Sequence, residues 1–168
     1  MIEKKGDIWK ITGDNDIIVI TTNGFVKANG ECVMGRGIAL AAKKRFGYIP
    51  KLLGDYIRKY GNRPFRLGNG IVSFPVKPAS SVLTASSHVV SHMKDKFNLG
   101  DTVPGWACIA DINIIVDSAH KLVAMADKFD WHRVFMPRPG CGAGQLDWSK
   151  VKNHLSAILD DRFIICTF

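Results

Sequence analysis

The stretch Asp16-Ile-Ile-Val-Ile-Thr-Thr22 decides the fold of this chain, because it is an apolar, β-branched run between turn residues. Such a run is typical of a strand that is buried on both faces, inside a sheet covered by helices. After it, Gly37 to Phe46 is rich in Ala and basic toward its end, and Pro50 begins a segment that runs to Tyr60 before Gly61. These features predict two helices that follow the strand.

The rest of the chain repeats this alternation. Further strands are expected from Gly70 to Val76, from Arg133 to Pro137 and from Arg162 to Phe168, and further helices from Asp111, as N-cap, to Ala126 and from Trp148 to Asp160. The alternation predicts an α/β fold, a three-layer α/β/α sandwich with a mixed, mostly parallel central sheet. In such sheets, ligands bind beyond the carboxyl ends of the strands.

The segment from Ser80 to Gly105 is long and polar, and neither the helix period nor the strand period is clear in it. A helix from Ser86 to Lys96 is the element that its pattern favours. We therefore expect residues 1–168 to form a single domain with an irregular insertion near residues 80–105. Pro75, just before this segment, favours an edge position or a strand end.

The composition favours an anionic partner. Lys and Arg number 23 against 15 Asp and Glu, a formal net charge of +8. This excess suits nucleotides, nucleic acid or phosphate esters, although it also serves solubility. The four cysteines are scattered, without the spacing of a disulfide framework or a metal site. With neither a signal peptide nor an apolar run of about 20 residues, the chain is expected in the cytoplasm, away from membranes.

Two glycine-rich loops each connect an expected strand to an expected helix. The first loop, residues 23–38, ends in Gly35-Arg36-Gly37, and the second, residues 137–146, contains Gly140-Cys-Gly-Ala-Gly144. Glycine lets a ligand approach the backbone, and successive N–H groups beside a helix N-terminus form an anion-binding concavity. Neither loop is a P-loop or a dinucleotide fingerprint. Together they predict a diphosphate site that is closed from two sides without a metal or other cofactor.

At these loops the sequence resembles the macrodomain family. Gly6-Asp7-Ile8 is similar to its G-D-I element, and Asn23 with the later Asn29-Gly30 resembles its Asn-bearing ribose loop. Cys32-Val-Met-Gly-Arg-Gly-Ile-Ala39 is similar to the C-x-M-G-x-G-I-A stretch of the branch that contains terminal ADP-ribose glycohydrolases and DNA-ADP-ribose-removing antitoxins. Pro139 to Trp148 is similar to the second loop of that branch. The resemblance covers nearly the whole chain except residues 80–105.

The resemblance implies that the ligand is ADP-ribose. Asp7 would accept a hydrogen bond from the adenine amine beside the Ile8 backbone, the two loops would hold the diphosphate, and Asn23 or Asn29 would bond the distal ribose. The implied ligand-binding residues are Asp7, Ile8, Thr22, Asn23, Met34, Gly35, Arg36, Gly37, Ile38, Pro137, Gly140, Cys141, Gly142, Ala143, Gly144, Gln145 and Leu146. As alternatives to these ligand roles, Asp7 is interpreted as a turn residue and Asn23 as a residue that tolerates a left-handed turn before Gly24.

The catalytic candidates are Lys77 and Asn29. Hydrolases of this branch that act on protein adducts use a Lys after a central strand, which Lys77 matches, and an Asp in the second loop, where this chain has Gly144. Relatives with glycine there are similar to DNA-adduct hydrolases and ADP-ribose-1''-phosphate phosphatases. A lysine with a lowered pKa could attack the anomeric carbon or hold its open-chain form. An exposed lysine at a strand end is otherwise a solvated charge.

Other reactive side chains give no catalytic pattern. His88 and His92 are an i, i+4 pair without a zinc-site signature and are interpreted as surface or supporting residues. Asp147 is interpreted as the N-cap of the Trp148 helix, and Cys141 as a small packing residue.

The sequence therefore leaves three alternative hypotheses about function. The first is a metal-independent hydrolase that releases ADP-ribose or its 1''-phosphate, the second a non-catalytic ADP-ribose reader, and the third a basic nucleic-acid-binding domain. Lys43-Lys44-Arg45 and Arg58-Lys59 could serve a nucleic-acid partner or be solvated helix faces. The expected partner is ADP-ribose or an ADP-ribosylated macromolecule, and the expected state is a monomer.

Overall fold

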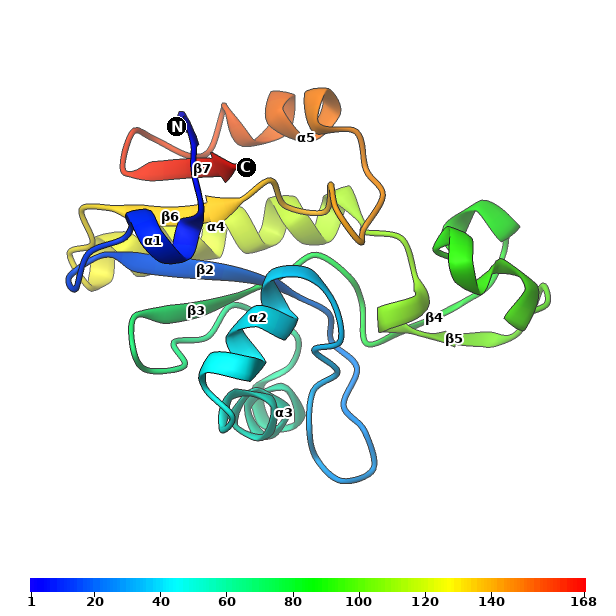
Figure 1. Ribbon diagram of the computed structural model, residues 1–168. Coiled ribbons are helices and arrows are strands. Elements are labelled where there is room, and N and C mark those ends of the chain that lie inside the picture. Colours follow the sequence, from blue (N-terminus) through cyan, green and yellow to red (C-terminus); the bar gives the residue numbers. More distant parts are fainter.

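The computed structural model describes residues 1–168 and contains a five-stranded sheet in which every pairing is parallel. The strand order is β1-β7-β6-β2-β3 (Figure 1). The strands are β1 (Ile2–Lys5), β2 (Ile17–Thr22), β3 (Ile71–Pro75), β6 (Val134–Pro137) and β7 (Phe163–Thr167). All five carboxyl ends therefore lie along one edge of the sheet. The edge position expected from Pro75 is confirmed, because β3 is the last strand.

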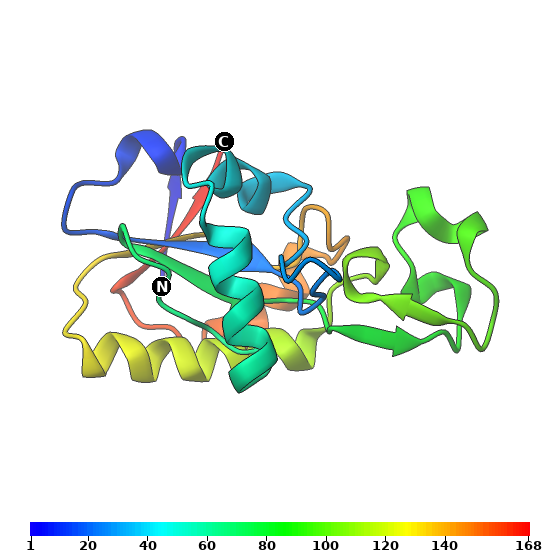
Figure 2. The same cartoon turned by 90° about the horizontal axis from the view of Figure 1, so that it is seen from below.

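Helices cover both faces of this sheet, as the alternation predicted. In Figure 2, α4 lies on one side of the strands, and α1 and α2 lie on the other. The helices are α1 (Ile8–Ile11), α2 (Gly37–Arg45), α3 (Ile49–Tyr60), α4 (Ile112–Lys128) and α5 (Trp148–Leu155). None of them combines the length and the apolar character that crossing a bilayer requires. The fold class inferred from the sequence is confirmed.

The apolar run of β2 is buried on both faces. Val19 belongs to the core shared with α4 and α5, while the next residue, Ile20, packs with α2 and α3. The same alternation occurs in β7, where Ile165 faces α5 and Ile164 packs with Ile8 of α1. Successive side chains of a strand point to opposite faces, so a sheet between two helix layers needs apolar residues at every position.

Residues 80–108 form a small lobe that projects beyond the carboxyl edge of the sheet (Figures 1 and 2). An antiparallel ribbon of β4 (Ser80–Val82) and β5 (Thr102–Pro104) carries the short 3-10 helices η1 (Ser86–His88), η2 (Ser91–Lys96) and η3 (Gly105–Ala107). The continuous helix expected from Ser86 to Lys96 is wrong. Val89 and Val90, both buried, interrupt it, because Val89 packs in the lobe and Val90 lines the cavity.

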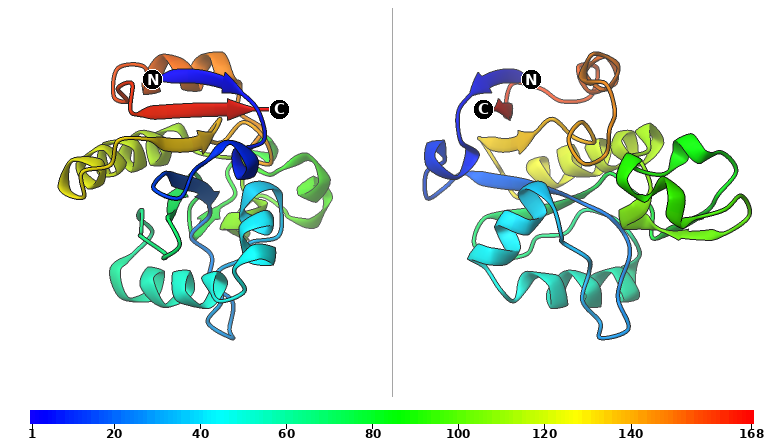
Figure 3. Two further views of the ribbon diagram at one scale, coloured as in Figure 1. Left: turned by 60° about the vertical axis from the view of Figure 1, so that its left-hand side comes forward. Right: turned by 45° about the vertical axis from the view of Figure 1, so that its right-hand side comes forward.

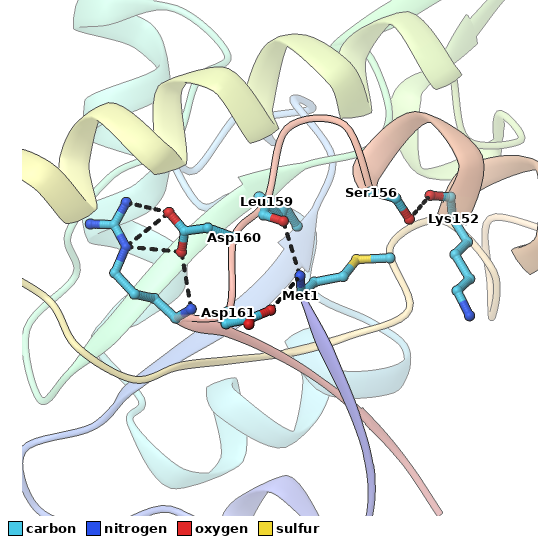
Figure 4. A network of polar contacts seen from close by, with 7 residues as sticks. Met1, Lys152, Ser156, Leu159, Asp160 and Asp161 are labelled. Carbon is cyan, nitrogen blue, oxygen red and sulfur yellow. Dashed lines mark hydrogen bonds and ion pairs between the residues drawn. The ribbon is translucent and has the colours of Figure 1, made fainter.

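The last helix is also shorter than expected, ending at Leu155 rather than Asp160. Turns follow, and they bring Leu159 into the core. Contacts of Met1 with Leu159 and of Asp160, drawn in Figure 4, hold these turns. The Met1 ammonium donates to the Leu159 carbonyl at 3.0 Å, and the Arg162 guanidinium donates to the Asp160 carboxylate at 2.8 Å. A helix continued through this segment could not make these contacts. The left panel of Figure 3 shows α5 behind β1 and β7.

Candidate functional site

A cavity of about 680 Å³ runs along the carboxyl edge of the sheet. Its walls contain residues that follow β1, β2, β3, β6 and β7, so it crosses the whole edge. Asp7 follows the edge strand β1, and Lys77 follows the opposite edge strand β3. With neighbouring strands about 4.8 Å apart, four spacings separate the two ends by roughly 19 Å. The size is typical of a small-molecule site, and the position is where open α/β sheets bind ligands.

The first loop presents unpaired main-chain donors to this cavity. Gly35, Arg36, Gly37 and Ile38 line it, and none of their N–H groups has a partner within the protein. Arg36 is the N-cap residue of α2, but its side chain makes no capping bond, so the amino end of the helix stays open. A Cβ added at Gly35 or Gly37 would meet nothing within 4 Å, so no neighbouring side chain covers the backbone at these two residues. Such an open helix start attracts anions.

The second loop presents a similar run of main-chain donors to the same cavity. The N–H groups of Gly142, Ala143 and Gly144 have no partner within the protein, and all three residues line the cavity. The loop itself is held by its neighbours: Leu146 N–H donates to the Gly140 carbonyl at 2.9 Å, and Ala110 N–H donates to the Gly144 carbonyl at 2.9 Å. Two fixed sets of donors thus face one cavity, which is the arrangement that a diphosphate requires.

Lys77 is buried at the β3 end of the cavity and connects the second loop with the lobe. Its Nζ donates to the carbonyls of Trp106 and Ala143, each at 3.2 Å. Burial lowers the pKa of Lys77 to about 8, and although Cys108 counters part of this effect, Arg36 adds to it. The side chain is only 7% exposed, so Lys77 is not a solvated surface charge. Its neutral form is therefore accessible near physiological pH.

Asp7 and Ile8 lie at the other end of the cavity. The Asp7 Oδ1 atom accepts from the Trp9 N–H at 3.0 Å and so caps α1. Asp7 therefore acts as a local capping residue and also lies at the cavity: one carboxylate oxygen caps α1, and the residue lines the cavity wall. Beside it, the Arg45 guanidinium stacks over the Trp9 ring at 4.2 Å, and both residues line the cavity.

The two asparagines have different positions. Asn23 lines the cavity, but its amide already bonds the loop: Nδ2 donates to the Val33 carbonyl at 2.9 Å, and Oδ1 accepts from the Phe25 N–H at 2.8 Å. Asn29, expected as a catalytic or ribose-binding residue, lies outside the cavity. It sits at an exposed turn, where its Oδ1 accepts from the Glu31 N–H at 3.0 Å. The resemblance at Asn29-Gly30 therefore corresponds to a turn in this chain.

Three expected residues of the second loop also lie outside the cavity. Gln145 turns toward the lobe, where its Nε2 donates to Ser91 Oγ at 3.2 Å. Leu146 packs against the core, and Cys141 packs there as well. Burial raises the pKa of Cys141 to about 11, so its thiol is not an activated nucleophile. The structure does bring together Thr22, Met34, Pro137, Gly140 and the remaining expected residues, all of which line the cavity.

Gly144 has a structural reason to be glycine. A Cβ at this position would lie 2.5 Å from the Gly140 carbonyl oxygen and 2.6 Å from the Ala110 side chain. Both contacts are too close for a side chain, and one of them is to backbone. An acidic residue therefore has no room at this point of the loop, so the departure from the family pattern is enforced by packing.

Several cavity residues were not expected from the sequence. Val90, His92 and Trp106 come from the lobe, and Arg45 and Arg138 add cations to Arg36 and Lys77. Against these four basic side chains the cavity contains a single acidic side chain, that of Asp7. His88, by contrast, is exposed and contacts Thr84 Oγ1 at 3.3 Å. The net charge of +8 could have suggested such a cluster, but no local pattern identifies its members.

The fold and the cavity together define an α/β domain with a cavity lined by four basic side chains along the carboxyl edge of its sheet. Among solved structures, the macrodomain of Mycobacterium tuberculosis DarG superposes with a TM-score of 0.68 at 20% identity, over 99% of this chain and 97% of that one. Thermosipho africanus DarTG in complex with ADP-ribose gives a TM-score of 0.61 at 18% identity, over 90% of this chain and 37% of that one. A macrodomain protein from Streptomyces coelicolor gives 0.60 at 14% identity, over 99% and 98%.

No protein-family model matches the sequence, and no curated protein does. The structural likeness nevertheless extends over nearly the whole chain, including residues 80–105, which the sequence resemblance did not cover. The chain therefore has the macrodomain fold, and the fold expected from the resemblance is confirmed.

Proposed function

We propose that the chain binds ADP-ribose along the carboxyl edge of its sheet. The observation that carries this proposal is the pair of unpaired N–H runs, Gly35 to Ile38 and Gly142 to Gly144, both of which line one cavity. The diphosphate lies between them, the adenine lies toward Asp7, and the distal ribose lies toward Lys77. The roughly 19 Å between the two ends accommodates an extended ADP-ribose. Thermosipho africanus DarTG, a structural neighbour, was solved with this ligand.

Calorimetric titration with ADP-ribose tests the proposal directly. Backbone N–H groups in a formed cavity should give a dissociation constant well below millimolar that changes little between 50 and 200 mM salt, in the manner of short-range hydrogen bonds. The alternative function, a basic nucleic-acid-binding domain, predicts an affinity for single-stranded DNA that falls steeply over the same interval. Absence of ADP-ribose binding at millimolar concentration by the folded protein would end the proposal.

We further propose that the domain hydrolyses an ADP-ribose derivative and that Lys77 carries the reaction. In its neutral form, the Lys77 amine attacks the anomeric carbon of the distal ribose. The bond from this carbon to the nucleic acid, protein or phosphate breaks, and that group leaves with a proton from the amine. Water then cleaves the new carbon–nitrogen bond, which releases ADP-ribose and restores the amine. The lowered pKa and the burial of Lys77 support this role. The substrate is an adduct on nucleic acid or protein, or the 1''-phosphate. No metal or cofactor takes part in this scheme.

The rival function is a reader that binds ADP-ribose without turnover. Lys77→Met separates the two, because it keeps most of the side-chain volume and removes the amine. For the enzyme, turnover of ADP-ribosylated DNA, ADP-ribosylated protein or ADP-ribose-1''-phosphate should disappear while ADP-ribose still binds. A wild-type protein that binds ADP-ribose and turns over none of the three is the reader. We also propose that the domain acts as a monomer in the cytoplasm and that residues 1–168 form one domain.

A further inference from the structure

Arg138 lies where the cavity meets a polar network outside it. It follows β6, the third of the five strands, and lines the cavity midway between Asp7 and Lys77. In the proposed complex the diphosphate occupies this middle part. The guanidinium also stacks over the Trp148 ring at 5.2 Å. Arg138 is therefore the side-chain cation of the second loop that is placed beside the phosphates, as Arg36 is in the first loop.

Glu3 is the residue that holds this arginine. It lies on β1, in register with Ile165 of β7, and both residues face the α5 side of the sheet. Its Oε1 atom accepts from Trp148 Nε1 at 2.9 Å and from Arg138 Nη2 at 3.4 Å, while its Oε2 atom accepts from Lys152 Nζ at 2.6 Å. These donors hold the pKa of Glu3 below its usual range, with Lys152 as the main cause, so Glu3 is ionised at neutral pH.

The geometry of this network fits a positioning role better than a stabilising role. Glu3, Arg138 and Lys152 are all more than one third exposed, and exposed ion pairs add little to folding stability. The Arg138 contact is also the longest of the three and uses one of the five guanidinium N–H donors. Glu3 thus limits the directions in which Arg138 can point and leaves most of its donors free. A side chain that is already oriented loses less entropy when it binds a ligand.

We infer, resting on the proposed ADP-ribose site, that Arg138 binds the ligand's diphosphate from the second loop and that Glu3 is the positioning residue that orients its guanidinium. Glu3 acts through Arg138 and does not touch the ligand. The two residues are separated by 135 positions in the sequence, and the pairing arises because β1 and β6 flank β7 in the sheet.

A double-mutant cycle on ADP-ribose binding tests this inference. Arg138→Met should weaken binding roughly tenfold, as expected for a lost charge-assisted hydrogen bond. Arg138→Lys should have an affinity between those of wild type and Arg138→Met, because an ammonium cannot donate two parallel hydrogen bonds to one phosphate. Glu3→Gln, which keeps an acceptor for Trp148 but removes the charge, should weaken binding about threefold. In the Arg138→Met background, Glu3→Gln should have no further effect.

Lys152→Met is the matched control, because Lys152 also bonds Glu3 but does not line the cavity. It should leave the dissociation constant unchanged, and the melting temperatures of Glu3→Gln and Lys152→Met should agree within a few degrees. A Glu3→Gln variant that binds like wild type, or whose effect persists without Arg138, overturns the positioning role. Unchanged binding by Arg138→Met overturns the ligand contact. A folded wild type that does not bind ADP-ribose rejects the proposed function itself, and this inference with it.

Discussion

The two glycine loops occupy equivalent places after a strand and before a helix, but they use glycine differently. In the first loop, side chains added at Gly35 and Gly37 would meet open space, and the following helix α2 begins without a side-chain cap. In the second loop only Gly142 is open, while Gly140 and Gly144 would bring a Cβ within 3 Å of neighbouring atoms. Among the glycines that line the cavity, those of the first loop therefore expose the backbone, and two of the three in the second loop permit close packing.

The start of the following helix shows the same contrast. Asp147 caps α5 by accepting from the Ser149 N–H at 2.8 Å, so this helix end is satisfied within the protein. The N–H groups at the start of α2 have no such acceptor. In the proposed ADP-ribose complex, the open helix end of the first loop attracts the diphosphate, and the internally bonded turn of the second loop orients its N–H donors.

The largest effect is expected from Gly144→Asp, the substitution that would restore the acidic residue of the family pattern. The new side chain has to displace the Gly140 carbonyl or Ala110, and it places a carboxylate in a buried position. The free energy of unfolding, measured in urea, should fall by about 3 kcal/mol or more. Gly47→Asp, at an exposed glycine with open space around it, should change it little. Equal stability of the two variants would contradict the packing role of Gly144.

Gly142→Val tests the open part of the second loop. Since nothing lies within 4 Å of the added Cβ, the protein should fold normally, but the side chain enters the cavity. ADP-ribose affinity, measured by calorimetry, should fall by about 100-fold or more, equivalent to about 2.7 kcal/mol. Gly47→Val adds the same side chain at another open position, away from the cavity, and should bind normally. Normal binding by Gly142→Val would show that this loop does not hold the ligand.

The pH dependence of turnover tests the amine that the second loop holds. With the pKa of Lys77 lowered to about 8, the neutral fraction is about one tenth at pH 7 and about nine tenths at pH 9. Turnover should therefore rise about tenfold across this interval and level off near pH 9. A rate that is flat from pH 7 to 9, or one that falls, would contradict nucleophilic use of the neutral amine.

The smallest effect is expected from Asp147→Ala, which removes the cap of α5. The Ser149 N–H loses its acceptor, so the free energy of unfolding should decrease modestly, by less than in Gly144→Asp. ADP-ribose affinity should stay the same, because Asp147 does not line the cavity. A clear loss of affinity without a loss of stability would mean that the start of α5 takes part in binding, and the contrast between the two helix ends would no longer hold.

Much of the architecture could be predicted because its signals are local. The run of β2 and the alternation that follows it specify strands buried between two helix layers, and Asp111 and Asp147 are recognisable as caps. The prediction was wrong where local signals were weak, as in the lobe, where the burial of Val89 and Val90 breaks the expected helix. Asn29, expected at the site, instead lies at an exposed turn outside the cavity, because a motif of two residues does not distinguish a ligand loop from a turn.

By itself, the sequence determined the strands β2, β3, β6 and β7, the helices α2 to α5, a mostly parallel sheet and the presence of two glycine loops near one sheet edge. These features follow from periodicity and backbone chemistry over a few residues. Only the tertiary structure decided which glycines leave their backbone uncovered, where the Lys77 amine lies, and that Glu3 pairs with Arg138. Such contacts join residues from distant strands, and their distances depend on strand order and packing, which no local pattern encodes.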